Sequence, residues 1–390
     1  MVVATVDSLA RARWALLFGN FVIGCGVFVV AGTLNDISRS LQVSVPLAGQ
    51  LISIGGAMMC FGAPLLAGWV AGFDRRRLLA WTMLWYAAGH ALCALMPSYA
   101  ALWPLRAATV LGAAVFTPQA AAAMGFMAAP EQRGRAITFI FLGWSVASVL
   151  GMPLSAWLGE VHGWRVAFGV VAALSVLAAV AVWVALPNGV KPAALSLQAW
   201  KEVFTHPLLM LIVLVTALQS AGQFTVFSYM APYYRQVLHA SPGQITLLFA
   251  WFGAFGLIGN LLLTRYIDRI GANRAVALAT VSITLALLLW PLATSVSTMM
   301  LVIVPWALGC FSANSGQQAR LNAAAPALAS ALMALNSSAM YLGQALGASG
   351  GGWLIAHGGY APLPWVGVLS LLAALALSLW VGRRSLKAHV

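Results

Sequence analysis

The stretch Gly68–Leu79, "GWVAGFDRRRLL", places three consecutive arginines, Arg75, Arg76 and Arg77, between two long apolar segments. Only 7% of the 390 residues are charged, whereas 62% are hydrophobic. A soluble domain of this length would need far more charge to cover its surface. Repeated runs of about 20 apolar residues are typical of helices in lipid, and arginines between them are typical of a loop at the membrane surface. The stretch therefore indicates an all-α polytopic membrane protein.

The apolar windows of the chain predict twelve transmembrane helices. They lie near residues 14–37, 47–71, 78–96, 100–127, 136–159, 165–186, 207–234, 244–267, 275–294, 298–319, 331–356 and 363–381.

The longest polar interruption, residues 187–206, divides these spans into two groups of six. Its sequence "PNGVKPAALSLQAWKEVFTH" contains a short amphipathic piece at 197–204. It predicts a linker between an N-terminal bundle, residues 1–186, and a C-terminal bundle, residues 207–390. A basic loop follows span eight, "TRYIDRIGANRAV" at 264–276, as another follows span two. The repeated placement indicates two pseudo-symmetric halves.

The basic residues also bear on partners and orientation. The net charge of +13 comes from short runs at the ends of the spans. That pattern favours contact with lipid headgroups and argues against the binding of nucleic acid. Lys and Arg gather on the side of both termini and the linker, whereas Arg39, Arg165 and Arg235 fall on the other. Both termini are therefore predicted to be cytoplasmic. The four cysteines form no C-x-x-C pair, so no metal site is predicted.

The loop after span eight carries a recognisable motif. Asp268, Arg269, Gly271 and Arg274 form D-R-x-G-x-x-R. With twelve spans and a central linker, the chain resembles the major facilitator superfamily, whose signature loop reads G-x-x-x-D-R-x-G-R-R. Thr264 stands where the leading glycine of that motif would be.

The first copy of the loop departs further from the motif. Gly68 matches its leading glycine, but Gly72 stands where the aspartate belongs. Asp74 is predicted instead to cap the start of span three. In the family this aspartate is a latch against the start of span eleven. The resemblance thus implies a weakened latch in the first half and a retained one at Asp268.

Three further stretches extend the resemblance. Gly143-x7-Gly151-x-Pro153-x5-Gly159 in span five is similar to the glycine–proline motif of the superfamily's antiporters. Arg106 with Gly112 in span four resembles the family's arginine motif. Residues 335–352, "LNSSAMYLGQALGASGGG", resemble span eleven of bacterial sugar and drug efflux permeases. The resemblance implies the major facilitator fold, alternating access, and a proton as coupling ion with no bound cofactor.

Small residues recur every four positions in span five, and glycines do so in span eleven. Such stripes let another helix approach closely, and Pro153 is expected to bend its helix. The resemblance implies that span five meets span eight, and span two meets span eleven, at a seam between the halves. Plain packing within a bundle is a compatible alternative. The predicted seam residues are Gly143, Gly151, Pro153, Gly159, Gly343, Gly347 and Gly351.

Arg106 is a charge inside a span, which is costly and calls for a partner. Asp36, at the outer end of span one, is the predicted partner in an outward gate or a protonation-linked pair. The alternative is that Asp36 interacts with Arg39 while Arg106 binds carbonyl groups. Val27 stands where related permeases often carry an acid, which favours a neutral or anionic cargo. Proton coupling is left to Asp36 or to His90, and His90 is mainly interpreted as a structural residue.

Polar and aromatic side chains of several spans are predicted to line a substrate cavity. Bonds between helices are the alternative role. A mixed aromatic and amide lining suits sugars or amphipathic organic molecules. The predicted lining residues are Asn20, Gln119, Gln219, Gln223, Phe227, Tyr229, Trp306, Asn314, Asn336 and Tyr341.

Together these features predict a monomeric secondary transporter of the bacterial inner membrane that exports small organic solutes by proton antiport. A uniporter or importer of a sugar, nucleoside or amino acid is the alternative. A membrane enzyme or sensor is disfavoured, because the sequence has no H-E-x-x-H, G-x-S-x-G or P-loop motif and no attached sensing domain. No catalytic residue is predicted.

Overall fold

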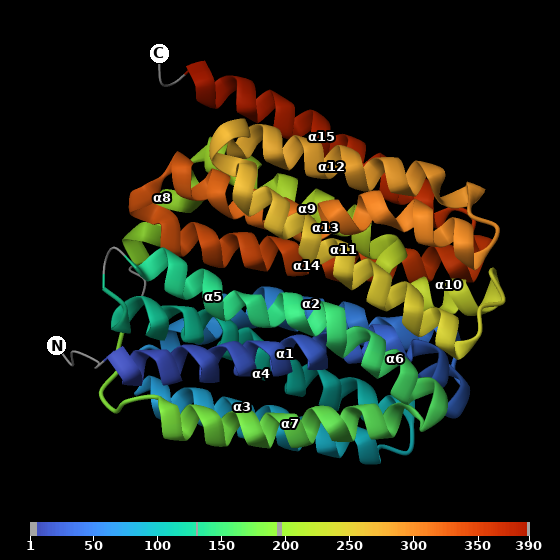
Figure 1. Ribbon diagram of the computed structural model, residues 1–390, viewed down its shortest axis with the longest axis horizontal. Helices are drawn as coiled ribbons and strands as arrows, with labels where there is room; N and C mark the ends of the chain where they lie inside the picture. The colour runs from blue at the N-terminus through green and yellow to red at the C-terminus, as the bar shows by residue number, and fades with distance from the viewer. Residues whose placement is uncertain (1–5, 130–131, 193–196, 388–390) are drawn as a thin grey trace. The chain divides into compact units, whose positions relative to one another are not determined.

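The computed structural model describes residues 6–129, 132–192 and 197–387. Every regular element in these ranges is helical (Figure 1). The helices before the linker are α1 (Val6–Ser40), α2 (Val45–Val70), α3 (Arg75–Leu95), α4 (Tyr99–Met127), α5 (Arg133–Val146), α6 (Met152–Val161) and α7 (Trp164–Ala185). The later ones are α8 (Leu197–Thr205), α9 (Pro207–Phe227), α10 (Met230–Gln236), α11 (Pro242–Ile270), α12 (Ala272–Leu289), α13 (Val296–Ala324), α14 (Ala329–Gly358) and α15 (Leu363–Lys387).

Each of the twelve predicted spans is helical in the structure. Eleven spans among the described residues are long and apolar enough to cross a membrane. The remaining span, α14, has 30 residues and is less apolar, because it carries Asn336, Ser337, Ser338 and Gln344. Span five consists of α5 and α6 joined by a π-helical turn, and span seven continues from α9 into α10. The amphipathic piece predicted in the linker is the short helix α8.

Contacts divide the chain into two compact units. Unit 1 comprises residues 1–43 and 61–194, and unit 2 comprises residues 44–60 and 195–390. The later boundary falls inside the predicted linker. The first half of α2, however, belongs to unit 2, although it was predicted to lie wholly in the N-terminal bundle. Hydropathy predicts where a helix begins and ends but not which unit it packs against, so the sequence could not show this division of α2.

The same neighbour pattern occurs in both units. In unit 1, α1 packs on α5, α6 and α7, and α3 packs on α4 and α7. In unit 2, α9 packs on α14 and α15, and α12 packs on α13 and α15. These helices of unit 2 repeat the contacts of the helices six spans earlier, as the predicted internal repeat requires.

Side-chain caps fix the starts of several helices. Asp74 accepts a hydrogen bond from the backbone N–H of Arg77 at the start of α3, which confirms the predicted cap. Ser98 does the same for α4, and Ser241 and Ser295 form capping boxes at α11 and α13. These caps satisfy free backbone N–H groups at the starts of the helices, where the chain leaves a loop and enters an apolar span.

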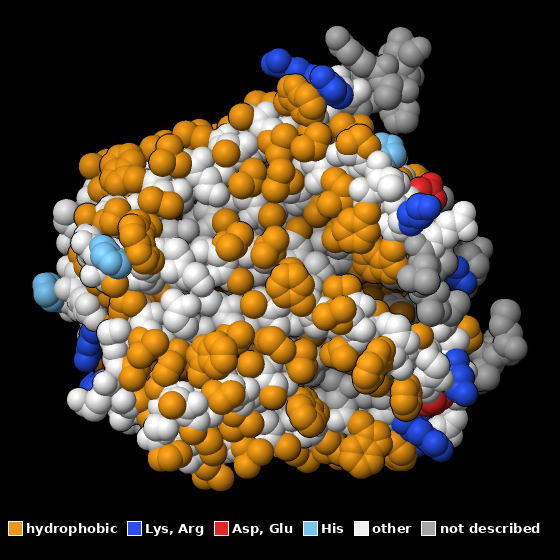
Figure 2. Space-filling view, turned by 180° about the vertical axis from the view of Figure 1, so that it is seen from behind, with side chains coloured by type: hydrophobic (Ala, Val, Ile, Leu, Met, Phe, Trp, Pro, Cys, Tyr) orange, Lys and Arg blue, Asp and Glu red, His pale blue; other side chains and the backbone are white. Residues whose placement is uncertain are grey.

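The surface matches a lipid environment. Figure 2 shows hydrophobic side chains spread over the visible face, with Lys and Arg side chains at its margins. Large exposed side chains include Leu65, Trp69 and Trp81. A soluble monomer rarely exposes so much apolar surface. The chain is therefore a multi-pass membrane protein.

Candidate functional site

Arg106 lies inside unit 1 among α1, α3, α4 and α7. Its side chain is only 2% exposed. Nη2 donates to the backbone carbonyl of Gly26 at 2.8 Å, and Nη1 lies 3.2 Å from Nε2 of His90. The guanidinium carbon lies 5.9 Å from the centre of the Phe168 ring. A polar group thus reaches the middle of α1 from α4.

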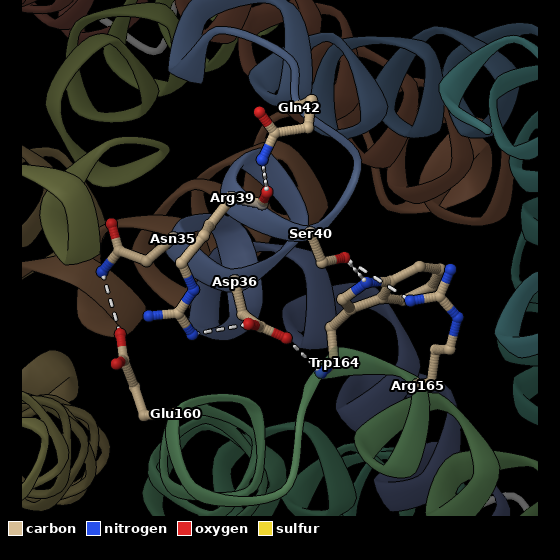
Figure 3. A network of polar contacts seen from close by, with 8 residues as sticks. All are labelled: Asn35, Asp36, Arg39, Ser40, Gln42, Glu160, Trp164 and Arg165. Atoms are coloured by element: carbon tan, nitrogen blue, oxygen red, sulfur yellow. Dashed lines mark hydrogen bonds and ion pairs between the residues drawn. The ribbon is translucent and has the colours of Figure 1, made fainter. Parts of the chain in front are cut away.

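Asp36 belongs to a separate network at the end of α1 (Figure 3). One carboxylate oxygen accepts from Arg39 at 2.7 Å, and the other accepts from the backbone N–H of Trp164 at 2.7 Å. Asn35 donates to Glu160 in the same network. Figure 3 also shows Trp164 and Arg165 directed at Ser40.

The predicted pair between Asp36 and Arg106 is therefore wrong. Arg106 contacts α1 at Gly26, about 15 Å below Asp36 at 1.5 Å rise per residue. That distance exceeds the reach of a guanidinium side chain. The alternative was correct for Asp36, which pairs with Arg39, and correct in part for Arg106, which binds a carbonyl and also His90.

Arg75 and Arg76 of the first signature loop have different environments. Arg75 is buried, and its Nη1 donates to the carbonyls of Val70, Ala71 and Phe73. It thereby satisfies carbonyl groups left free where α2 ends. Arg76 donates to Asn188 and stacks over Trp183.

Asp74 connects this loop to the start of the linker. One carboxylate oxygen caps α3, and the other accepts from the backbone N–H of Gly189 at 2.5 Å. The N–H of Arg75 donates to Val190 at 2.9 Å. We call the contacts of residues 74–76 with residues 188–190 the loop–linker clamp. The clamp lies within unit 1.

The second signature loop is a tight connection between α11 and α12. Gly271 has a φ of +79°, in the region that favours glycine. Arg269 and Arg274 are exposed. The side chain of Asp268 lies outside the described residues. Gly68, the leading glycine of the first signature loop, differs from Gly271. A Cβ at Gly68 would meet no atom within 4 Å, so close packing does not require a glycine at this position.

The glycines of span five pack against α1. A Cβ at Gly143 would overlap the backbone of Leu17 and Phe21, and one at Gly151 would overlap Cys25. Gly159 faces Thr33 in the same way. The predicted partner, span eight, is therefore wrong for these three glycines. They allow close contact within unit 1 instead.

Pro153 follows a π-helical turn at residues 147–151. Proline has no N–H to donate to the carbonyl four residues earlier, so the α-helical pattern is broken at this point. The predicted disturbance of span five thus takes the form of a π turn between α5 and α6.

In span eleven, the glycine stripe packs against α9. Cβ atoms at Gly343, Gly347 and Gly351 would overlap backbone atoms of Ala217, Ala221 and Thr225. This again is packing within one unit, where α9 and α14 take the places of α1 and α5. The expected contact between spans two and eleven is present elsewhere on these helices. Gly56 of α2 faces the backbone of α14 at Tyr341 and Ala345, within unit 2.

Several of the predicted cavity residues in unit 2 make hydrogen bonds to side chains of a neighbouring helix. Gln223 accepts from Trp306 at 3.0 Å, and Gln219 donates to Thr280 at 2.8 Å. Asn336 donates to Asn314 at 3.1 Å. These bonds join helices, as the alternative role expected.

Aromatic residues continue this region. Phe227 contacts Phe252 and Trp306, and Tyr229 donates to the carbonyl of Ala348. Tyr341 is buried in α14. At the end of the cluster, Tyr360 donates to Gln236, and burial raises the pKa of Tyr360 to about 12. The hydroxyl therefore remains a donor at neutral pH.

In unit 1, Asn20 bridges three helices. It donates to the carbonyl of Ile140 at 3.1 Å and accepts from Thr117 at 3.0 Å. Gln119 is buried in α4 with its amide oxygen unpartnered. Of the two, Gln119 retains hydrogen-bonding capacity.

Sequence reasoning missed some polar residues. Tyr86 donates to the carbonyl of Ile23 at 3.1 Å beside Arg106. Arg320 is buried and donates to Ser378 of α15. A tyrosine in an apolar run carries no positional signal. Arg320 directly follows a span predicted to end at residue 319, whereas the helix α13 continues to Ala324.

Comparison with known proteins identifies the family. The sequence profile of the Major Facilitator Superfamily matches residues 16–328 and 212–389. The chain belongs to the Major Facilitator Superfamily. It is 31% identical over 368 residues to "Inner membrane transport protein YdhP" of Escherichia coli K12, with 94% of each chain covered. It is 25% identical over 371 residues to the "Uncharacterized MFS-type transporter YbcL" of Bacillus subtilis, covering 94% of this chain and 95% of that one.

Solved structures of superfamily members share the fold. A bacterial homologue of the human lysosomal transporter Spinster aligns with a TM-score of 0.76 at 16% identity, covering 98% of this chain and 99% of that one. The peptide transporter POT aligns with a TM-score of 0.75 at 17% identity, with the same shares covered. As a member of the Major Facilitator Superfamily, the protein is a membrane transporter of small molecules and not an enzyme.

Proposed function

We propose that this transporter exports small organic solutes across a bacterial inner membrane in exchange for protons, by alternating access. The observation that carries the proposal is the similarity to an inner membrane transport protein over 94% of both chains. The glycine–proline motif of span five, which resembles that of the superfamily's antiporters, supports efflux. A monomer surrounded by lipid, with both termini in the cytoplasm, accords with the distribution of Lys and Arg.

The proposed cargo is neutral or anionic. Asp36 is the one carboxylate among the buried charged residues that the structure describes. It lies at the end of α1 and already contacts Arg39. Val27, where related permeases often carry an acid, is partly exposed. A cationic drug would therefore lack a carboxylate partner in the middle of this helix.

Asp36 is also the proposed proton-binding group. Its two oxygens have different partners, since one accepts from Trp164 and the other from Arg39. A proton on the second oxygen would release Arg39 and leave the bond to Trp164 in place. Protonation could thus change the charge of the network without unfolding the start of α7.

Reconstituted vesicles test this function. The purified protein would be placed in liposomes containing the pH dye pyranine, and arabinose, uridine and chloramphenicol would be added under an imposed pH gradient. Antiport predicts that the transported solute changes the internal pH, and that the gradient accelerates its flux. Protein-free liposomes are the control. Solute flux that does not respond to the gradient would instead establish the uniporter.

A further inference from the structure

We propose that His90 is a neutral positioning residue for Arg106, held as the Nδ1-protonated tautomer so that Nε2 accepts a hydrogen bond from the guanidinium. The inference follows from the chain of contacts Tyr86–His90–Arg106–Gly26. The role of His90 in transport rests on the proposed function, but its charge state and tautomer do not.

The tautomer follows from the partner of Nδ1. This atom lies 2.9 Å from the backbone carbonyl of Tyr86, one turn earlier on α3. A carbonyl oxygen can only accept, so Nδ1 must carry the hydrogen. In a neutral imidazole, Nε2 is then an acceptor. The backbone of α3 therefore sets which nitrogen faces Arg106.

Arg106 supplies the matching donor. Guanidinium groups only donate hydrogen bonds, and Nη1 lies 3.2 Å from Nε2 of His90. A protonated His90 would place an N–H against another N–H and one cation beside another. The neutral imidazole is the only form of His90 that completes this contact.

The surroundings offer backbone carbonyls but no negative charge to balance a second cation beside Arg106. From α1, Cys25 and the Gly26 carbonyl face this region, and α7 contributes Trp164 and Phe168. On α3 and α4, the remaining polar groups are Tyr86, Cys93 and Thr109. None of these described groups is a carboxylate, and the His90 side chain is 0% exposed.

The contacts also explain what the positioned guanidinium does. Arg106 donates to Gly26, and the Tyr86 hydroxyl donates to Ile23, three residues earlier on α1. Both bonds thus reach α1 within one turn, next to Val27. A Cβ at Gly26 would overlap the Tyr86 hydroxyl, so the glycine makes room for this contact. His90 holds Arg106 in the orientation that ties α4 to α1.

Nitrogen NMR of the full chain in lipid nanodiscs tests the tautomer directly. Histidine would be labelled with ¹⁵N, and the His90 signals identified by their loss in H90Q. We expect a protonated Nδ1 and an unprotonated Nε2, both unchanged from about pH 5 to pH 8, where ordinary histidines titrate. The exposed His162, His206, His239 and His357 provide internal controls. A proton gained at Nε2 in this range, or the opposite tautomer, would overturn the inference.

Two substitutions test the positioning role. Glutamine can place its amide oxygen where Nε2 lies, whereas asparagine reaches only the place of Nδ1. We expect H90Q to keep the wild-type melting temperature and H90N to lower it. In an R106M background, H90N should lower the melting temperature little further, because the contact between residues 90 and 106 is already absent. Equal loss in H90Q and H90N, or full additivity with R106M, would count against the role.

Flux in the pyranine assay adds a readout that simple destabilisation would not move. For whichever solute is transported, H90Q should keep the wild-type pH dependence, and H90N should lose turnover. If both variants fold yet lose the response to the pH gradient, His90 carries the proton and the proposal is wrong. If no solute is transported, the proposed function fails, while the NMR result still decides the charge state.

Discussion

Asp36 shows how a single residue can serve a helix far away in the sequence. Helix α7 begins at Trp164, after Gly163, which has a φ of +91° and no side chain with which to cap the helix. Asp36, 128 positions earlier, accepts the N–H of Trp164 instead. A carboxylate at a helix N-terminus also interacts favourably with the helix dipole. The residue therefore stabilises the junction of α1 and α7.

Substitutions of Asp36 separate this cap from proton coupling. D36A leaves the N–H of Trp164 unpartnered and should lower the free energy of unfolding by about 1–3 kcal/mol. D36N keeps an oxygen for Trp164 and loses only the pair with Arg39, so it should cost about 1 kcal/mol or less. Under the proposed coupling, D36N transports solute without responding to the pH gradient. Thermal unfolding in detergent and the pyranine assay measure the two effects.

Arg39→Ala is the matched control for the lost ion pair. The Arg39 side chain is 62% exposed, so its removal should destabilise the protein no more than D36N does. Equal destabilisation by D36N and D36A would show that Asp36 does not act as a cap. A normal pH response in D36N would exclude it as the proton site.

At the scale of elements, the glycine stripes set how closely helix pairs approach. The stripe of α14 brings its backbone against α9, as the stripe of α5 and α6 does against α1. Because lipid gives no hydrophobic drive between helices, such close packing carries much of their association.

Two glycines of α14 give a matched test of this packing. A Cβ at Gly347 would overlap the backbone carbonyl of Ala221, whereas one at Gly350 would meet no atom within 4 Å. We expect G347A to destabilise the protein by about 1–3 kcal/mol through overpacking. G350A should be neutral or stabilising by up to about 1 kcal/mol, since alanine favours helix. Thermal unfolding of both variants measures this, and equal effects would contradict the assignment.

The stripes also mark the limit of what the sequence could predict. Four-residue spacing identified the faces of Gly143 and Gly347 that allow close contact, but not the helices they contact. Spacing describes one helix, and its neighbour is set by tertiary packing. Likewise, Pro153 predicted a disturbance of span five. It did not predict that the disturbance would be a π turn, because that depends on the hydrogen bonds that the neighbouring backbone groups form instead.

The error over Arg106 has the same origin. The sequence located a buried charge, and only the depth at which α4 crosses α1 could assign its partners. That depth places Arg106 beside Gly26 and His90 rather than Asp36. The spans and the Asp74 cap were predictable because each depends on local composition alone.

The loop–linker clamp is a further element with a direct test. D74A removes the acceptor for the N–H of Gly189 and for the cap of α3. Amide exchange at Gly189 should therefore accelerate on hydrogen–deuterium exchange, and residues 188–190 should be cleaved sooner by protease. R77A is the control, because Arg77 contributes its backbone N–H to the cap and the variant retains it. Unchanged exchange in D74A would show that the clamp does not restrain the linker.

At the scale of the whole molecule, the proposed topology puts the basic loops of both halves on one side of the membrane. The loop at Arg75–Arg77, the linker, and the loop at Arg269–Arg274 all follow spans that end on the same side in a twelve-span topology. Buried Arg75 and Arg320 make hydrogen bonds inside the protein. The exposed arginines next to the apolar spans are therefore the ones that bear on orientation.

Reporter fusions test that orientation. Green fluorescent protein after residue 390 should fluoresce, because it folds in the cytoplasm, and alkaline phosphatase inserted after Gly359 should be active, because it needs the periplasm. The same phosphatase after Gly189 should be inactive. R76Q/R77Q removes the charges of half-buried Arg76 and exposed Arg77 and keeps Arg75, which holds the carbonyls at the end of α2. If these charges orient the first half, this variant should raise phosphatase activity after Gly189 while activity after Gly359 stays high. Activity after Gly189 in the unaltered chain would reverse the proposed topology.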